Sequence, residues 1–385
     1  PHLVPKLARE HGIKARDITP WSHVVSMLYA QFIHAIGLND VSDALRANRA
    51  AMASIRGAVP PSRNGLSHAN KTRDPKMAEE LFWAMLRHFE TLCPGFGGVK
   101  FRRLPRRFKR TINVIDSSTI KLVANCLDWA RHRRQKAAAK CHMRLDLQTF
   151  LPRFALVKAA NTHDASEAAA LCADVRAGEI VVFDKAYVDF AHLHQLARRE
   201  VFWVTRAKTN MAYEMVGQQT APGGPILVDA IVQLKIEKSR QEYPDPMRLV
   251  VAEVEINGQP TVMSFITNNR EWAPSSIGEL YKSRWGVEVF FKQLKQTLQL
   301  ADFLGHSEDA IRWQIWTALL TYVLLRFIAY RSRWRRSFAR LFTVLRAVLW
   351  DRLDLYSVLA FCGTAPDPPP LRTRPGQAYL PGFTP

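Results

Sequence analysis

The segments TINVID (residues 111–116) and EIVVFD (residues 179–184) decide the fold class of this 385-residue chain. Each is a short run of apolar and β-branched residues that ends in an aspartate, which is typical of a buried strand. Helical periodicity follows the second run at residues 190–199, and the apolar pattern VFWVTR continues the series at residues 201–206. Strands that alternate with helices in this way predict an α/β core.

The chain on either side of these runs changes pattern, and the changes predict its domain boundaries. Helical periodicity begins behind Thr19-Pro20 and behind Asp74-Pro75, each pairing an N-cap residue with proline. Strand patterns after Lys208 include a hairpin at Asn257-Gly258, and helical periodicity resumes at Ser276. The predicted segments are an N-terminal helical domain (1–99), the first part of the core (100–207), a β-rich insertion (208–271), the end of the core with C-terminal helices (272–362), and a Pro-rich disordered tail (363–385).

The amino-acid composition limits the classes of partner that the protein is expected to bind. Apolar residues make up 48% and charged residues 23%, an ordinary globular mixture that excludes a largely disordered chain. Lysine and arginine number 54 against 34 acids, which gives a formal net charge of +20. Arginine, whose planar guanidinium suits phosphate, supplies 37 of these bases. This imbalance predicts a polyanionic partner, nucleic acid before an anionic membrane.

Cysteine usage and hydropathy exclude other classes of protein. The five cysteines form no C-x-x-C pair and no Cys/His metal spacing, which favours reduced thiols in a cytosol over a disulfide framework. The longest apolar run, residues 315–325, is shorter than the roughly 18 residues that a membrane span needs. The chain begins Pro-His-Leu, so we expect its natural start to lie further upstream.

Two aspartates stand where the apolar runs of the core stop. Asp116 precedes Ser117-Ser118-Thr119, and Asp184 precedes Lys185-Ala186-Tyr187. The carboxyl ends of core strands are where α/β sheets place their chemistry. Either aspartate alone is better explained as a helix cap or turn residue, so a catalytic interpretation depends on further acids.

A third acid lies in YKSRWGVEVFFKQLK, residues 281–295. At about 100° per residue on a helix, Tyr281, Arg284, Glu288 and Lys295 fall within one strip of about 60°, with Lys292 beside it. The opposite side carries apolar residues, namely Val287, Phe290, Phe291 and Leu294. Such a strip is either a solvated ion-pair face or a metal-binding carboxylate flanked by cations that hold phosphate.

These motifs resemble the signature of DDE transposases of the insertion-sequence-four family. The strip has the spacing Y-x2-R-x3-E-x6-K, and the upstream aspartates lie in NVIDSSTI and VVFDKAY in the family's order. Further matching segments are LSHANKTRD (66–74), KCHMRLD (140–146), THD (162–164), ITNN (266–269) and GHSEDAIRWQIW (305–316). The resemblance covers about residues 20–330. Lys185-Ala186 departs from it, because family members usually have Arg-Gly there.

The resemblance implies a ribonuclease-H-like catalytic core with the β-rich insertion between its second and third acids. It implies that Asp116, Asp184 and Glu288 are catalytic and hold two Mg²⁺ ions, for which Mn²⁺ would substitute. Paired metals of this kind suit carboxylate oxygens, activate the nucleophile and stabilise the leaving oxygen. The implied DNA-binding residues are Tyr281, Arg284, Lys292 and Lys295.

The expected activity is therefore that of a transposase, a Mg²⁺-dependent endonuclease and strand-transfer enzyme acting on the terminal inverted repeats of its insertion sequence. Its partners would be double-stranded DNA at the element ends and target, with a homodimer in the DNA complex and no membrane. It would work in the bacterial cytoplasm, near the nucleoid, and its N-terminal helices would help to bind DNA. Two alternatives stay open: another ribonuclease-H-like nuclease, such as a junction resolvase, or a catalytically silent DNA-binding relic.

Other polar and aromatic residues have weaker signals. Asp164 is a possible site acid, but a helix cap is favoured, and Asp189 is also expected to cap a helix. His142 is expected in the core or facing DNA, and packing is favoured over base stacking for Trp285. The arginine-rich, acid-free stretch between residues 309 and 351 fits a solvated face and a DNA-facing helix pair about equally.

Overall fold

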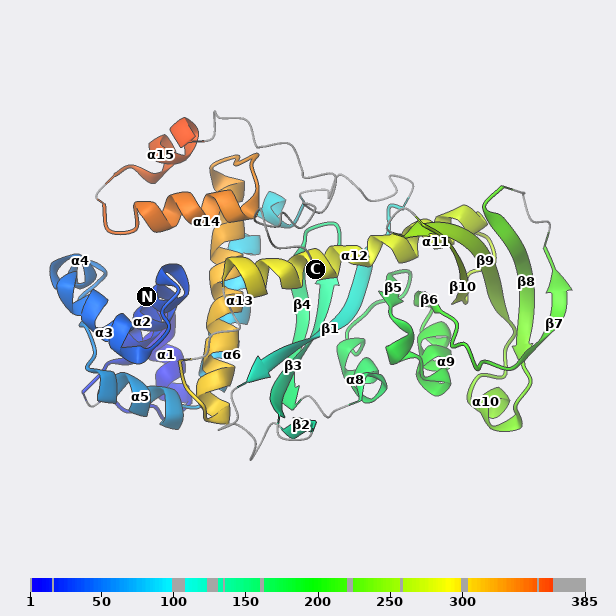
Figure 1. The fold of residues 1–385 in the computed structure, drawn as a ribbon, viewed down its shortest axis with the longest axis horizontal. Helices are drawn as coiled ribbons and strands as arrows, with labels where there is room; N and C mark the ends of the chain where they lie inside the picture. Colours follow the sequence, from blue (N-terminus) through cyan, green and yellow to red (C-terminus); the bar gives the residue numbers. More distant parts are fainter. Residues whose placement is uncertain are drawn as a thin grey trace, which may run out of the picture. The chain divides into compact units, whose positions relative to one another are not determined.

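The computed structural model contains a large mixed sheet, with helices that precede, interrupt and follow its strands along the chain (Figure 1). The residues that it describes are 2–15, 17–98, 108–122, 131–133, 136–159, 163–219, 224–256, 259–298, 304–351 and 353–362. The chain divides into two compact units, Pro1–Val323 and Leu324–Pro385. The Asn257-Gly258 turn, the Pro-rich tail and most of the basic stretch at residues 100–110 lie outside the described residues.

The N-terminal region is helical, as its sequence periodicity predicts. Thr19 caps the second helix by accepting a hydrogen bond from the Ser22 amide, with Pro20 at the first helical position. Asp74 accepts a bond from the Lys76 amide at the start of the last long helix. The helices are α1 (Leu3–Glu10), α2 (Pro20–Ile33), α3 (Leu38–Ala47), α4 (Arg49–Ser54), α5 (Arg63–Thr72) and α6 (Lys76–Leu92), followed by the 3₁₀ turn η1 (Pro94–Gly98).

The motif at residues 66–74 ties these helices together. The Asn70 Oδ1 lies 2.7 Å from the Nε2 of His23, and both side chains are buried. The backbone oxygen of Arg73 accepts a 2.8 Å bond from the indole of Trp313, which is 1% exposed. These contacts give the motif a structural role, because each pairs a buried donor with a buried acceptor from another helix. Burial also rules out a DNA-facing position for Trp313.

The centre of the sheet combines parallel and antiparallel strands. Strand β1 (Ile112–Leu122) pairs in parallel with β5 (Ile180–Phe183), which pairs in parallel with β6 (Phe202–Arg206). On its other edge β1 pairs antiparallel with β3 (Lys136–Asp146). The remaining elements of this region are β2 (Arg131–Arg133), β4 (Leu151–Ala159), α8 (Asp164–Leu171), the 3₁₀ turn η3 (Lys185–Tyr187) and α9 (Phe190–Arg198). The structure thus confirms an α/β fold.

The first core strand is longer than the sequence suggests. The prediction that it ends at Asp116 is wrong, since β1 continues to Leu122. Its parallel register with β5 does stop there, because Ile115 pairs with Phe183 and the next residue on that side is Asp184. Beyond this point β1 stays extended by pairing with β3, where Ser117 lies opposite His142. Asp116 and Asp184 therefore follow the last pairs of two adjacent parallel strands.

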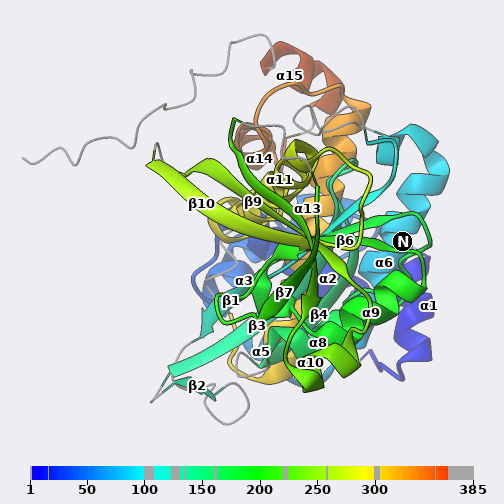
Figure 2. The same cartoon turned by 90° about the vertical axis from the view of Figure 1, so that its right-hand side faces the viewer.

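The β-rich segment extends the core sheet. Strand β10 (Gln259–Thr267) forms the predicted hairpin with β9 (Met247–Ile256) and also pairs antiparallel with β6. The sheet has ten strands, in the order β2-β3-β1-β5-β6-β10-β9-β8-β7 with β4 beside β3. Figure 2 views it from the side on which β7 lies in Figure 1 and shows the strands fanning out, as sheet twist requires. The other elements here are β7 (Tyr213–Gln218), β8 (Ile226–Leu234) and α10 (Glu237–Glu242).

Helices return after the sheet. Helix α11 (Pro274–Ser283) leads through Arg284 into α12 (Trp285–Lys292), which continues as the π-helical turn η4 (Gln293–Thr297). Then come α13 (Glu308–Arg331), α14 (Phe338–Ala347) and α15 (Leu355–Cys362). Helix α12 packs against β1 through the predicted apolar side, with Val287 and Phe290 fully buried. In the part of the chain that the structure describes, no helix is long and apolar enough to cross a membrane.

Candidate active site

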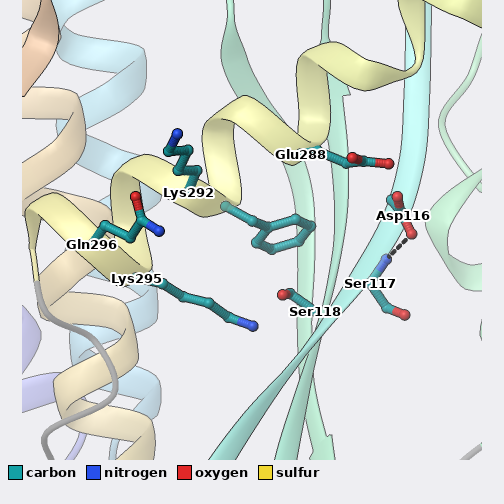
Figure 3. Close-up of a pocket in the computed structure, with 8 residues that line it drawn as sticks. Asp116, Ser117, Ser118, Glu288, Lys292, Lys295 and Gln296 are labelled. Carbon is teal, nitrogen blue, oxygen red and sulfur yellow. Dashed lines mark hydrogen bonds between the residues drawn. The ribbon is translucent and has the colours of Figure 1, made fainter. Parts of the chain in front are cut away.

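The structure brings the three predicted acids to one region of the sheet. Asp116 lies on β1, Asp184 directly follows the neighbouring strand β5, and Glu288 faces them from α12. Asp116 and Glu288 line the same cavity of about 490 Å³, into which they point from opposite walls (Figure 3). The other residues that line it are Ser117, Ser118, Phe291, Lys292, Lys295 and Gln296.

Arg284 links two of these carboxylates. Its guanidinium donates one hydrogen bond to Oδ2 of Asp116 and another, of 2.9 Å, to Oε1 of Glu288. The side chains of Arg284 and Asp116 are 11% and 18% exposed, so solvent screens their contact weakly, whereas Glu288 is 43% exposed. Burial alone would lower the pKa of Arg284, but Asp116 and the neighbouring acids hold it above its ordinary value. Arg284 is therefore a fixed positive charge between Asp116 and Glu288.

Tyr281 makes the corresponding contact with the second aspartate. Its hydroxyl donates a 3.1 Å hydrogen bond to Oδ1 of Asp184, which also accepts a bond from the Lys185 amide. Burial, reinforced by the negative charge of Asp184, raises the pKa of Tyr281 to about 12. The phenol is therefore neutral at physiological pH and acts as a hydrogen-bond donor.

Asp116 has a perturbed carboxyl group. Its pKa is raised to about 6, mainly by burial and also by the negative charges of Asp184 and Glu288. Arg284 and the Ser117 amide oppose this shift by favouring the ionised form. A carboxylate held next to other carboxylates in a partly dry site is a typical feature of a functional centre.

The two lysines of the strip, Lys292 on α12 and Lys295 on the π-helical turn, lie beside the part of β1 that follows Asp116. Lys295, on the π-helical turn, donates a 2.7 Å hydrogen bond to the backbone oxygen of Thr119, and its side chain extends toward Ser118 (Figure 3). Lys292 lines the same cavity. Tyr281 and Arg284 thus face the acids, while the lysines lie at the other end of the cavity.

The carboxylate set fits a divalent cation chemically. Within the described ranges, no three His, Cys, Asp or Glu side chains form a preassembled metal cluster. Arg284 already satisfies part of the negative charge of Asp116 and Glu288. The oxygen donors are those that Mg²⁺ prefers, and the charges of Asp184 and Glu288 add to the effect of burial in raising the pKa of Asp116.

The structure agrees with some of the predictions for the residues with weaker signals and contradicts others. Asp189 caps α9 by accepting a 2.9 Å bond from the His192 amide, as predicted, and His142 is fully buried in the core. The preference for Asp164 as a cap is wrong, because its carboxylate bonds to side chains on β1 and β3. The preference for packing at Trp285 is also wrong, since 52% of this residue is exposed. Gln296 and Ser118 were missed, because polar residues without charge give no signal in a single sequence.

Comparison with known protein families shows which family the chain matches. The family described as Transposase DDE domain matches residues 107–324, which is more than half of the chain. The chain belongs to this family of transposases. The resemblance drawn from the motifs is therefore confirmed, and the matched region of the transposase DDE domain contains all three acids of the site.

Individual relatives carry related names. A putative transposase, y4zB, of Sinorhizobium fredii is 27% identical over 305 residues, covering 78% of this chain and 81% of the relative. The probable transposase for insertion sequence element IS5377 of Geobacillus stearothermophilus is 27% identical over 225 residues, 58% of each chain. A solved piggyBac transposase synaptic complex with hairpin DNA is similar with a TM-score of 0.44 and 11% identity, covering 94% of this chain and 78% of that one.

Proposed function

We propose that this protein is a transposase that cuts and joins double-stranded DNA at the terminal inverted repeats of its insertion sequence. The observation that carries this proposal is the meeting of Asp116, Asp184 and Glu288 around Arg284 and Tyr281. The strands β4, β3, β1, β5 and β6 with their helices would be the ribonuclease-H-like core. The β7–β10 strands would be its insertion.

The three carboxylates would hold two Mg²⁺ ions, with Mn²⁺ as a substitute. Metal bound there supplies activation of the attacking oxygen and stabilisation of the leaving one. Asp116, Asp184 and Glu288 would provide the ligand oxygens from β1, from the end of β5 and from α12. Arg284 would exchange its carboxylate partners for a DNA phosphate, which its planar donors suit.

The other cations would position the DNA next to the cut. Lys292 and Lys295 line the cavity beyond Asp116 and Glu288, where a strand leaving the scissile phosphate would pass. The hydroxyl of Tyr281 is a neutral donor within the same site. General affinity would come from the excess of basic residues over the whole chain, helped by the N-terminal helices. We further propose a homodimer on the DNA and a bacterial cytoplasmic location near the nucleoid.

A transposition assay tests this function directly. A donor plasmid carries a resistance marker between the DNA sequences that flank this protein's reading frame, and the protein is supplied from a second plasmid. We expect the marker to move to new sites with the wild-type protein and not with Asp184→Asn. Cleavage of branched junctions without movement would favour a junction-resolving nuclease, and binding without cleavage would favour the silent relic.

Lys295→Ala should separate positioning from affinity. One lost phosphate contact changes the slope of log affinity against log salt by only about 0.9, so DNA binding should change little. Single-turnover cleavage at saturating protein should fall by about 10²-fold, because a misplaced scissile phosphate loses its near-attack geometry. Lys235→Ala, which removes an exposed lysine after β8, is the matched control. Equal rates for the two variants would leave the strip as a solvated basic face.

A further inference from the structure

A group of polar side chains meets at Ser117, the residue that follows Asp116 on β1. Its centre is Asp164 at the start of α8, whose Oδ1 accepts a 2.8 Å hydrogen bond from the hydroxyl of Ser117. Its Oδ2 accepts a 3.0 Å bond from Nζ of Lys140 on β3. Asp164 and Lys140 are 17% and 15% exposed, so these charge-assisted bonds form in a largely dry environment.

Two buried rings complete this group. Nδ1 of His142 lies 2.9 Å from the hydroxyl of Tyr187 and 3.4 Å from Oδ1 of Asp164. His142 is fully buried and Tyr187 is 1% exposed. The pKa of His142 is lowered to about 4, mainly by burial and also by Lys140, against the opposing charge of Asp164. The ring is therefore neutral, pairs with the hydroxyl of Tyr187 and packs close to Asp164.

Asp164, Lys140 and His142 come from motifs that contain none of the three acids of the site. Asp164 belongs to THD, Lys140 and His142 to KCHMRLD, and Tyr187 to the segment after Asp184. Their meeting point is Ser117, which directly follows Asp116. A polar cluster assembled from four separate segments is expensive to bury unless its members satisfy one another.

Ser117 connects this cluster to the carboxylate of Asp116. Its hydroxyl donates to Asp164, while its amide donates a 2.7 Å bond to Oδ1 of Asp116. Successive strand residues face opposite sides of the sheet, so fixing the Ser117 side chain on one side fixes the orientation of its peptide. That peptide in turn holds Asp116 toward Arg284 and Glu288.

We propose that Asp164 is a positioning residue for the proposed metal site, acting through Ser117 to hold the Asp116 carboxylate in its binding orientation. This inference rests on the proposed function. Groups that orient metal ligands in this way change metal affinity or activity by about 10- to 100-fold when they are removed. A purely structural role for Asp164 in α8 predicts a loss of stability without that change.

Mn²⁺ binding to the full-length protein on its DNA, followed by electron paramagnetic resonance, tests this proposal. We expect Asp164→Asn and Ser117→Ala each to weaken Mn²⁺ binding by about 10-fold or more, with DNA affinity unchanged. Ser117→Ala with Asp164→Asn should be no worse than either alone, because both break one connection. Cleavage by each variant should need correspondingly more Mg²⁺.

Glu167→Gln is the matched control, because it removes the other acid in the first turn of α8. It should lose the same favourable interaction with the helix dipole and keep wild-type Mn²⁺ affinity. If Asp164→Asn fails to fold, Ser117→Ala still decides the question. Wild-type Mn²⁺ affinity in Ser117→Ala would overturn the positioning role alone. A wild-type protein that neither binds Mn²⁺ nor cuts DNA would overturn the proposed function and this inference together.

Discussion

Asp116→Asn, Asp184→Asn and Glu288→Gln should each lower DNA cleavage by about 10³-fold or more, while DNA affinity stays nearly unchanged. Each change removes a negative oxygen from the proposed metal site, and metal stabilisation of the transition state is worth several kcal/mol. Affinity depends on the many cations behind a net charge of +20, and these substitutions remove none of them.

The measurement is single-turnover cleavage of DNA that carries an element end, together with binding of the same DNA. Glu253→Gln, which neutralises an exposed acid on β9, is the control and should cut at the wild-type rate. A variant of any of the three acids that cuts as fast as wild type with Mg²⁺ would remove that residue from the mechanism.

Unfolding of the metal-free protein provides a second readout for Asp116→Asn. The pKa of Asp116 in the folded protein is about 6, above its ordinary value of 3.8. Ionisation therefore disfavours the folded state as pH rises above the ordinary value, and the full cost is present above pH 6. At pH 8 with chelator, Asp116→Asn should unfold at the wild-type temperature or higher. Lost cleavage in such a protein cannot be ascribed to misfolding.

The sequence predicts the local elements of the core well and their non-local pairing poorly. EIVVFD is recognisable because all residues of β5 are buried, which produces an uninterrupted apolar run. Ser117-Ser118-Thr119 looks like a turn, yet it is strand, because β3 supplies a partner some twenty residues later in the chain. Strand β7 was not predicted, since every one of its residues is exposed and no alternation marks it.

The same distinction applies to the candidate site. Helical spacing places Tyr281, Arg284 and Glu288 on one face, and the structure brings them together with Asp116 and Asp184. Spacing along one helix cannot show that Arg284 bonds two carboxylates from different elements. It also treats Lys295 as part of an ideal helix, whereas a π-helical turn presents this lysine to the backbone of β1.

A buried ion pair that no sequence pattern reveals joins the β7–β10 strands to the helix that carries Tyr281. Arg248 on β9 donates two bonds of 2.7 Å to Asp229 on β8, and both side chains are 2% exposed. Its third bond, of 2.6 Å, goes to the backbone oxygen of Trp272, two residues before α11 begins. Arg248 thus fixes both the strand pair and the entry to α11.

Asp229→Ala should lower the free energy of unfolding by about 3–5 kcal/mol, because it leaves the guanidinium of Arg248 buried without its counter-charge. Urea unfolding of the full chain, followed by a signal from the sheet, measures this change. Glu214→Ala is the matched control, since it breaks an exposed ion pair between β7 and Arg240 on α10 and should cost about 1 kcal/mol or less.

Replacing both partners separates the two contributions to this loss. Asp229→Leu with Arg248→Met removes both charges and keeps apolar volume, so it should recover most of the stability lost in Asp229→Ala. A residual cost of about 1–3 kcal/mol is expected, because the backbone oxygen of Trp272 loses its donor. If the double variant is as unstable as Asp229→Ala, packing or the Trp272 contact dominates, and the uncompensated charge is not the cause. Recovery would instead show that the pair mainly specifies how these strands join α11, because an apolar pair would stabilise the same strands about as well.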